Sequence, residues 1–290
     1  MSQTPRLLYL VADYGDDLAF AEVHLRLRKL VREPFDFQMV RTPKFSTVAT
    51  GFAVAQLALE GGINPPLIFH NTDPRADGQE HAGNDGSPLV FVRLKNGAEV
   101  IGPNAGYCFS FLPTEVIVKA EVDYEKPLDR AFGFRSRDWF PSVVSAISKG
   151  VLSTTVEGFR PSLVHGQVNF ASLPTDRTIA CWVDGYGNVK TSERWLDYAE
   201  VPDGEEFTVQ VLRENRPLHP EAQRVVFRAK GDFHSHAGEI SLLPGSSGPL
   251  KNRYLELFAR CNSAHDKGAS ELLGGVLPGD TINLQLHQPV

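Results

Sequence analysis

The stretch RLLYLVADYGDDLAFAEVHLRLRKLVRE, residues 6–33, decides the fold of the first half of the chain. Its first eight residues form an apolar run that ends in Asp13, which predicts a buried β-strand. The rest of the stretch places Phe20, Val23 and Leu27 at helical spacing, with acids at the start, where the helix dipole favours them. A buried strand that leads into an amphipathic helix is typical of an α/β domain.

The following segments continue this alternation and predict one α/β domain. Apolar runs predict strands at 35–40, 65–73, 87–94, 99–106 and 114–122, and helical patterns occupy 46–62 and 138–150. Strands separated by helices favour a mainly parallel sheet with helical cover. Ligands of such sheets bind beyond the carboxyl ends of the strands, which is where Asp13 and Asp73 fall.

The second half of the chain has a different texture. It follows EGFRPSLVHG, residues 157–166, which we interpret as a linker between an α/β domain at 1–156 and a second domain at 167–290. Short runs with period-two alternation lie at 177–192, 205–213, 223–231, 239–245, 253–260 and 280–288. They predict a smaller antiparallel barrel or sandwich of about five or six strands.

Composition and charge exclude several classes of protein. The 290 residues are 42% hydrophobic and 22% charged, as in an ordinary globular protein. With a net charge of -6 and no basic run longer than RLRK (26–29), we expect no nucleic-acid partner. The apolar run near the N-terminus is too short for a signal peptide or a membrane span. Cys108, Cys181 and Cys261 form no CxxC pair and are odd in number, which favours a cytoplasmic protein.

Three aspartates at or near predicted strand ends are candidate ligand contacts: Asp13, Asp73 and Asp184. A carboxylate can accept hydrogen bonds from two ribose hydroxyls or from an ammonium group. Each could equally cap the turn or helix that follows it. In VDGYGN, residues 183–188, the glycines allow a tight approach to a ligand and Asn188 could read a purine edge, but a plain hairpin turn fits the same residues.

The stretch HNTDPRADGQEHAG, residues 70–83, is a second candidate site. His70, Asp73, Asp77 and His81 are close in sequence, yet Gly and Pro interrupt any helix that would align them, and no zinc or calcium motif is present. We therefore expect no bound metal. The motifs GxSxG, GxxxxGK[ST] and GxGxxG are also absent, which argues against ordinary hydrolases, kinases and dehydrogenases.

Six segments, in order along nearly the whole chain, resemble the S-adenosylmethionine (SAM) hydroxide adenosyltransferase family, whose relatives include the fluorinase and the chlorinase. The segments are ADYGDD (12–17), TDPRADG (72–78), GPNAGY (102–107), FRSRDWFPSVVSAISKG (134–150), VDGYGNVKTS (183–192) and RYLELFARCNSA (253–264). The resemblance implies an α/β domain followed by an antiparallel β domain, in a homotrimer that binds SAM between subunits. It also implies attack of water or hydroxide at the ribose 5′ carbon, giving adenosine and L-methionine without a metal or redox cofactor.

The resemblance also implies roles for individual residues. Asp13 would hold the ribose hydroxyls, Phe45 would pack on the adenosine, and Asp184 would bind the methionine ammonium, with Tyr186 and Asn188 at the adenine. The methionine carboxylate would meet Ser247 or a residue near Asn252, a choice that the sequence leaves open.

The family's water-activating group is altered in this chain. Its aspartate is present as Asp73, but its arginine position holds Glu80 and its histidine position holds Arg135. We predict that Asp73, His81 and Arg135 rebuild an acid, an imidazole and a cation around one water. The alternative is a SAM- or nucleoside-binding protein that has lost turnover. Halogenation ranks third: Ser136 matches a serine beside the halide of the fluorinase, but the Asp73 carboxylate would repel a halide.

Overall fold

The structure is a computed structural model that forms two compact units, Met1–Ala171 and Ser172–Val290. It describes residues 4–60, 62–74, 86–123, 134–148, 161–164, 168–219, 224–229, 235–249 and 253–286. The segment 157–166, expected as a linker, contains the short strand β7 (Ser162–Val164), which pairs with the sheet of the first unit. The division between the units therefore falls later in the chain than the sequence indicates.

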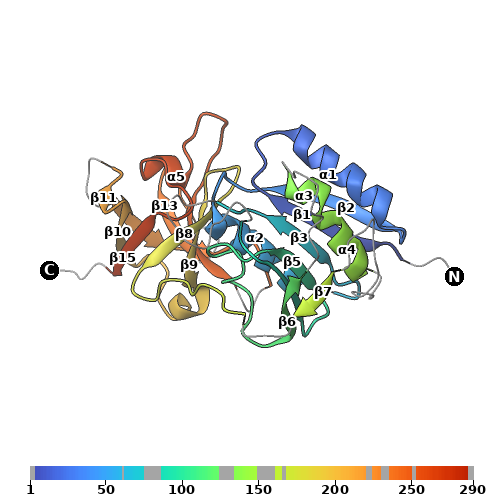
Figure 1. Ribbon diagram of the computed structural model, residues 1–290. Coiled ribbons are helices and arrows are strands. Elements are labelled where there is room, and N and C mark those ends of the chain that lie inside the picture. Colours follow the sequence, from blue (N-terminus) through green and yellow to red (C-terminus); the bar gives the residue numbers. More distant parts are fainter. Residues whose placement is uncertain are drawn as a thin grey trace. The chain divides into compact units, whose positions relative to one another are not determined.

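The first unit is built on a seven-stranded sheet in the order β2-β1-β3-β5-β4-β6-β7 (Figure 1). Its strands are β1 (Arg6–Ala12), β2 (Phe35–Arg41), β3 (Leu67–Asn71), β4 (Leu89–Leu94), β5 (Glu99–Pro103), β6 (Val116–Asp123) and β7. The pairs among β2, β1, β3 and β5 are parallel, as expected, whereas β4, β6 and β7 run antiparallel to their neighbours. A short turn joins β4 to β5, and so tight a connection can only join antiparallel strands.

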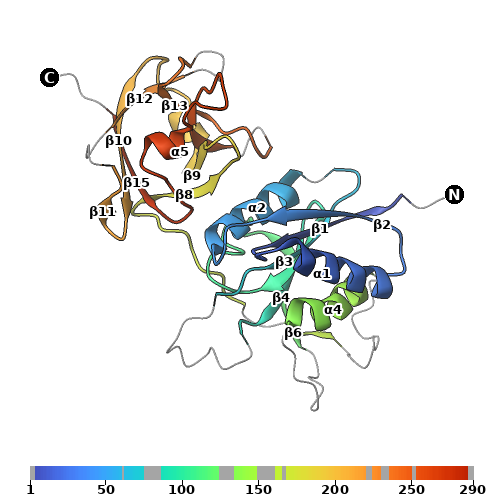
Figure 2. The same ribbon diagram turned by 90° about the horizontal axis from the view of Figure 1, so that it is seen from above.

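Helices cover both faces of this sheet. The helices of the unit are α1 (Asp17–Leu30), α2 (Thr47–Glu60), α3 (Arg135–Asp138) and α4 (Phe140–Ser148). In Figure 2, α2 lies on one face and α1 and α4 lie on the other. Asp16 caps α1 by accepting a hydrogen bond from the Ala19 amide, and Phe20 and Leu27 on α1 pack with Phe140 in the core. No helix in the described parts of the chain is long and apolar enough to cross a membrane.

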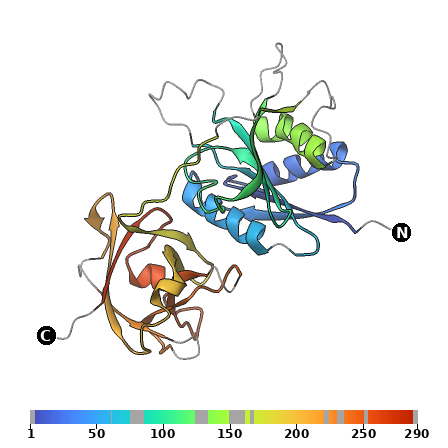
Figure 3. The same cartoon turned by 90° about the horizontal axis from the view of Figure 1, so that it is seen from below.

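The second unit is a β-barrel, which settles the choice between a barrel and a sandwich. Its strands are β8 (Thr178–Val183), β9 (Val189–Arg194), β10 (Glu206–Arg213), β11 (Arg216–Pro217), β12 (Arg224–Arg228), β13 (Ile240–Pro244), β14 (Tyr254–Ala259) and β15 (Thr281–Leu286). Pairing of β10 with β15 closes seven of them into the ring seen in Figure 3, and β11 extends β10. All pairs are antiparallel except β12 with β13.

Two short helices complete the barrel unit, a 3-10 helix η1 (Trp195–Tyr198) and α5 (Ala269–Leu272). The barrel core contains Val209, Leu242 and Leu257 from three different strands, and α5 adds Ala269 to it. The run at 177–192, read from the sequence as one segment, is two strands, β8 and β9, joined by the turn that holds Asp184.

Candidate functional site

Asp13 and Phe45 lie together at the carboxyl edge of the parallel strands. Asp13 directly follows β1, and its Oδ2 accepts a hydrogen bond of 2.8 Å from the backbone amide of Phe45. Phe45 has a left-handed φ of 61° and its side chain is 71% exposed. Burial raises the pKa of Asp13, although the Phe45 amide acts in the opposite direction. The contact presents a carboxylate and an unpacked aromatic ring at the same edge.

Asp73 and Arg135 form an ion pair at this edge. Arg135 Nη2 donates to Asp73 Oδ2 at 2.7 Å, and the two side chains are only 15% and 10% exposed. Ser87 fixes the same carboxylate, because its hydroxyl donates to Oδ1 at 2.7 Å and its amide to Oδ2 at 3.1 Å. The structure thus brings Asp73 and Arg135 together. His81 and Glu80 lie outside the described residues.

Gly86 makes room for this ion pair. It has a φ of 70°, and a β-carbon at this position would collide with Arg135 Nη2 and Asp73 Oδ2. Only glycine combines that backbone conformation with the required space. Gly86 and Ser87 escaped the sequence analysis because the chain between them and Asp73 carries no pattern that predicts their contact.

Hydrogen bonds among buried hydroxyl groups hold the carboxyl ends of β2 and β3 against α2. Thr50 on α2 donates to Thr42 at 3.0 Å and shares a 2.7 Å hydrogen bond with Thr72. Thr42 follows β2 and Thr72 follows β3, so the bonds tie two strand ends to one helix. The Cys108 thiol donates to the Thr72 carbonyl at 3.6 Å, and burial raises the pKa of that thiol, which keeps it protonated. This network fixes the backbone from which Asp73 projects.

Ser136 and Tyr14 line the α3 side of the same edge. Ser136 is 3% exposed, and Tyr14 packs edge-on against Phe134 with ring centroids 5.2 Å apart. Burial raises the pKa of Tyr14, partly offset by the nearby Ser136 hydroxyl. The Tyr14 hydroxyl has no hydrogen bond of normal geometry among the described residues. Both side chains are neutral donors near Asp13 and Arg135.

His70 is a core residue of the first unit. It is fully buried, and burial lowers its pKa to about 3, so the ring is neutral. It packs edge-on against Phe109 and lies so close to Gly102 that a β-carbon there would meet the ring. Within the described ranges, no three His, Cys, Asp or Glu side chains are grouped so as to hold a metal.

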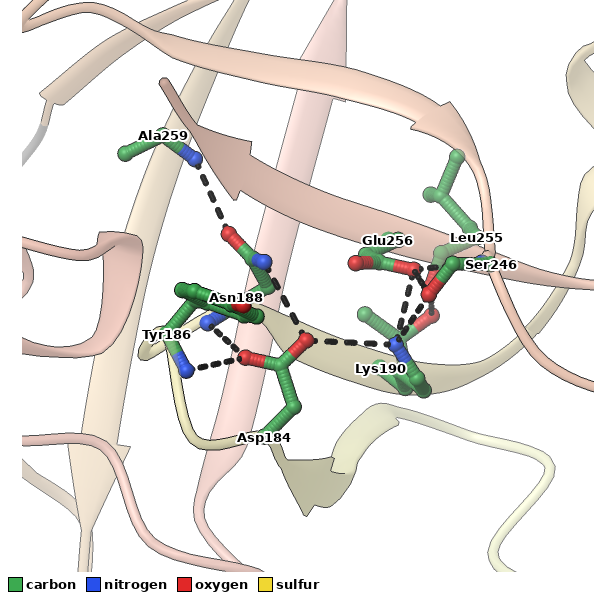
Figure 4. Close-up of polar contacts among 9 residues, drawn as sticks. Asp184, Tyr186, Asn188, Lys190, Ser246, Leu255, Glu256 and Ala259 are labelled. Atoms are coloured by element: carbon green, nitrogen blue, oxygen red, sulfur yellow. Dashed lines mark hydrogen bonds and ion pairs between the residues drawn. The ribbon is translucent and has the colours of Figure 1, made fainter. Parts of the chain in front are cut away.

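In the barrel unit, Asp184 organises the turn between β8 and β9 (Figure 4). Its Oδ1 accepts hydrogen bonds from the amides of Tyr186 at 2.9 Å and Asn188 at 3.0 Å, and its Oδ2 accepts one from Asn188 Nδ2 at 3.1 Å. Asn188 is 5% exposed, and its Oδ1 accepts from the Ala259 amide at 3.3 Å. Asp184 therefore builds the turn, as one of the two sequence interpretations has it, and the Tyr186 side chain remains 77% exposed.

A buried ion pair lies next to this turn. Lys190 Nζ is 2.9 Å from Glu256 Oε2, and the side chains are 5% and 1% exposed. Lys190 also donates to the Ser246 hydroxyl at 3.0 Å, and Glu256 accepts from the Ser246 amide at 2.8 Å. These residues, drawn in Figure 4, belong to β9, β14 and the loop after β13. Together with Asp184 they form what we call the barrel cluster: Asp184, Lys190, Ser246 and Glu256.

Ser247 differs from its neighbour Ser246 in its hydrogen bonding. The Ser246 hydroxyl is engaged with Lys190, whereas the Ser247 hydroxyl is buried and has no hydrogen-bond partner in the described chain. An unsatisfied buried hydroxyl costs roughly 1–3 kcal/mol, which a ligand acceptor would offset. Of these two serines, Ser247 is thus the one whose hydroxyl has no hydrogen-bond partner among the described residues.

The two-unit fold has known structural neighbours. The crystal structure of an uncharacterized conserved protein from Thermotoga maritima is similar, with a TM-score of 0.69 and 17% identity over 96% of this chain and 99% of that chain. A conserved hypothetical protein from Thermus thermophilus gives a TM-score of 0.60 and 18% identity over 96% and 99%. No protein-family model and no curated protein matches the sequence. At these identities the similarity establishes the fold alone.

The predicted site residues fall into two groups, one in each unit. The first unit holds Asp13, Phe45, Asp73, Arg135 and Ser136 at the carboxyl edge of its sheet, and the barrel unit holds Asp184, Tyr186, Asn188 and Ser247 around one turn and one loop. Lys190, Ser246 and Glu256 are the members of the barrel cluster that the sequence analysis missed. The ligand contacts of all these residues remain predictions.

Proposed function

We propose that this protein hydrolyses SAM to adenosine and L-methionine by attack of water at the ribose 5′ carbon. The observation that supports this most is the fixed Asp73–Arg135 ion pair beside Asp13 at the carboxyl edge of the sheet. The C5′–S bond breaks, its electron pair goes to the sulfur, and the C5′–O bond forms as water releases one proton. Because the sulfonium is already a good leaving group, the reaction needs no metal or redox cofactor.

Charge and exposure in both units suit the parts of SAM. One oxygen of Asp13 accepts a hydrogen bond from the Phe45 amide. The other oxygen accepts no hydrogen bond from another described residue, so it can accept hydrogen bonds from ribose hydroxyls. The exposed Phe45 ring offers a stacking surface for the adenosine. The barrel cluster holds two carboxylates and one ammonium. Its net negative charge complements the net positive charge of SAM. We infer a homotrimer in which different subunits contribute the two groups.

Arg135 and His81 together activate the attacking water. The guanidinium, held by Asp73, stabilises hydroxide as it develops, and His81 takes the proton because imidazole titrates near neutrality. Asp73 itself is a positioning residue, since both of its oxygens already accept hydrogen bonds from Ser87 or Arg135.

The hydrogen bonds of Asp73 favour a second candidate function. Three of its roughly four lone-pair sites already accept hydrogen bonds from Ser87 and Arg135, so at most one is left to orient a water, which suits a protein that binds SAM or a nucleoside without turnover. A measurement of SAM turnover distinguishes the hydrolase from the binding protein directly.

We expect purified protein incubated with SAM to release adenosine and methionine in equal amounts, measured by chromatography with and without chloride or fluoride. Intact SAM with measurable affinity would instead support the silent binding protein. A halogenated nucleoside would support halide transfer, and failure to bind any adenosine compound would contradict all of these functions.

The Arg135→Ala and His81→Ala variants should each release adenosine roughly 100-fold more slowly, while their affinity for SAM changes far less. The reason is that the contacts of both side chains with the attacking water strengthen in the transition state. The matched control is Arg137→Ala on the same short helix, since Arg137 pairs with Glu22 and Asp138 away from Asp73. Single-turnover rates and equilibrium binding check this. Unchanged turnover in both variants would remove Arg135 and His81 from the mechanism.

A further inference from the structure

Lys190 forms a long ion pair with Asp184 in the barrel cluster, drawn as a dashed line in Figure 4. The Nζ to Oδ2 distance is 3.7 Å, which is beyond a hydrogen bond. Of the three N–H donors of this ammonium, one meets Glu256 and one meets Ser246. The third has no hydrogen-bond acceptor among the described residues. Lys190 therefore has one unused donor.

Asp184 has a matching unused acceptor. A carboxylate offers about four lone-pair sites. Two on Oδ1 receive the Tyr186 and Asn188 amides, and one on Oδ2 receives Asn188 Nδ2. The remaining site on Oδ2 belongs to the same oxygen that lies 3.7 Å from Lys190. An open donor and an open acceptor of opposite charge thus stand side by side.

We propose that Lys190 binds the α-carboxylate of an amino-acid group whose α-ammonium meets Asp184. The amino nitrogen and the nearer carboxylate oxygen of an α-amino acid are about 2.7 Å apart, from standard bond lengths. Two parallel hydrogen bonds of ordinary length connect such a pair to two atoms 3.7 Å apart. The inference rests on the proposed function in one respect: there, this amino acid is the methionine end of SAM.

The charge of the barrel cluster explains why Lys190 would select a complete amino acid. An amine without a carboxylate satisfies Asp184 and leaves the third Lys190 donor open. A zwitterion satisfies both atoms and leaves the net charge of the cluster unchanged. Because Lys190 is only 5% exposed, water screens its attraction for a carboxylate weakly. Lys190 is therefore a specificity-determining residue in addition to the partner of Glu256.

The test compares affinities for SAM, decarboxylated SAM and 5′-methylthioadenosine, which lacks the amino-acid end. The affinities are measured by calorimetry on proteins that also carry Arg135→Ala, because this substitution limits turnover of SAM during the measurement. The variants are Lys190→Arg, which keeps the charge, and the double variant Lys190→Met with Glu256→Gln, which removes the ammonium without leaving a buried carboxylate unpaired. Because each result is a ratio within one protein, differences in the folded fraction cancel.

We expect the unsubstituted Lys190 protein to bind SAM at least roughly 10-fold tighter than decarboxylated SAM, as one charge-assisted hydrogen bond provides. The double variant should lower this ratio to below roughly 3-fold and leave the affinity for 5′-methylthioadenosine unchanged. The Lys190→Arg variant should retain most of the preference for SAM.

Two results would overturn the proposal. An unchanged ratio with both affinities unchanged in the double variant would mean that Lys190 does not contact the ligand carboxylate. Equal weakening of SAM and decarboxylated SAM, which also leaves the ratio unchanged, would mean that Lys190 is purely structural. Failure of the proposed function gives a different result, because SAM then yields no adenosine while the affinity ratio still depends on Lys190.

Discussion

Replacing Gly86 by Ala is expected to lower adenosine formation by roughly 100-fold, about as much as loss of Arg135 itself. The new β-carbon would collide with the Arg135 guanidinium and the Asp73 carboxylate, so the ion pair must open or move. The left-handed φ of 70° adds a backbone cost of about 1–2 kcal/mol for a residue with a β-carbon. Steady-state rates and thermal unfolding, measured together, separate these two effects.

Gly204 provides the matched control for Gly86. Its φ is 87°, but a β-carbon there meets nothing within 4 Å, so Gly204→Ala carries the backbone cost without a collision. We expect it to lower the melting temperature and to leave the rate of the folded protein unchanged. A double variant, Gly86→Ala with Arg135→Ala, should be no slower than Arg135→Ala alone. Additive losses in that double variant would show that Gly86 acts independently of Arg135.

The sequence predicted those parts of the fold that depend on local patterns. The strand that ends at Asp13 and the helix that follows it are encoded by an apolar run and a helical repeat within 28 residues. The reversed direction of β4 and the closure of the barrel by β10 and β15 depend on pairing between distant segments. No periodicity within a single segment carries that information, so the sequence alone does not distinguish a barrel from a sandwich.

The candidate site shows the same division between local and distant information. Asp73 and Arg135 were paired through a resemblance at two motifs, and the structure joins them across 62 positions of sequence. Lys190 was missed because a lysine in a strand normally faces solvent. Its burial depends on Glu256, 66 positions away, and only their spatial contact makes a charged side chain stable inside the barrel. The apolar and polar order around Lys190 offered no sign of that partner.

Replacing Glu256 by Leu is expected to destabilise the barrel by about 3–5 kcal/mol, because it leaves Lys190 buried with only Asp184, at 3.7 Å, as a charged partner. The Ser246 amide also loses its acceptor. For a unit of this size such a loss lowers the melting temperature by roughly 10 °C or more. Hydrogen exchange of the full chain, followed on barrel peptides by mass spectrometry, measures the change in this unit separately from the first.

The double variant Glu256→Leu with Lys190→Met should recover most of that stability, because it replaces a buried ion pair by apolar side chains and leaves no unpaired charge. The exposed pair of Asp176 and Arg177 is the control within the same unit: its side chains are 75% and 51% exposed, so Asp176→Ala should cost no more than about 1 kcal/mol. If the double variant is as unstable as Glu256→Leu, the cost lies in the lost contacts of Ser246 and in packing. If it recovers stability but loses the preference for SAM over decarboxylated SAM, the buried pair exists for ligand selection and not for stability.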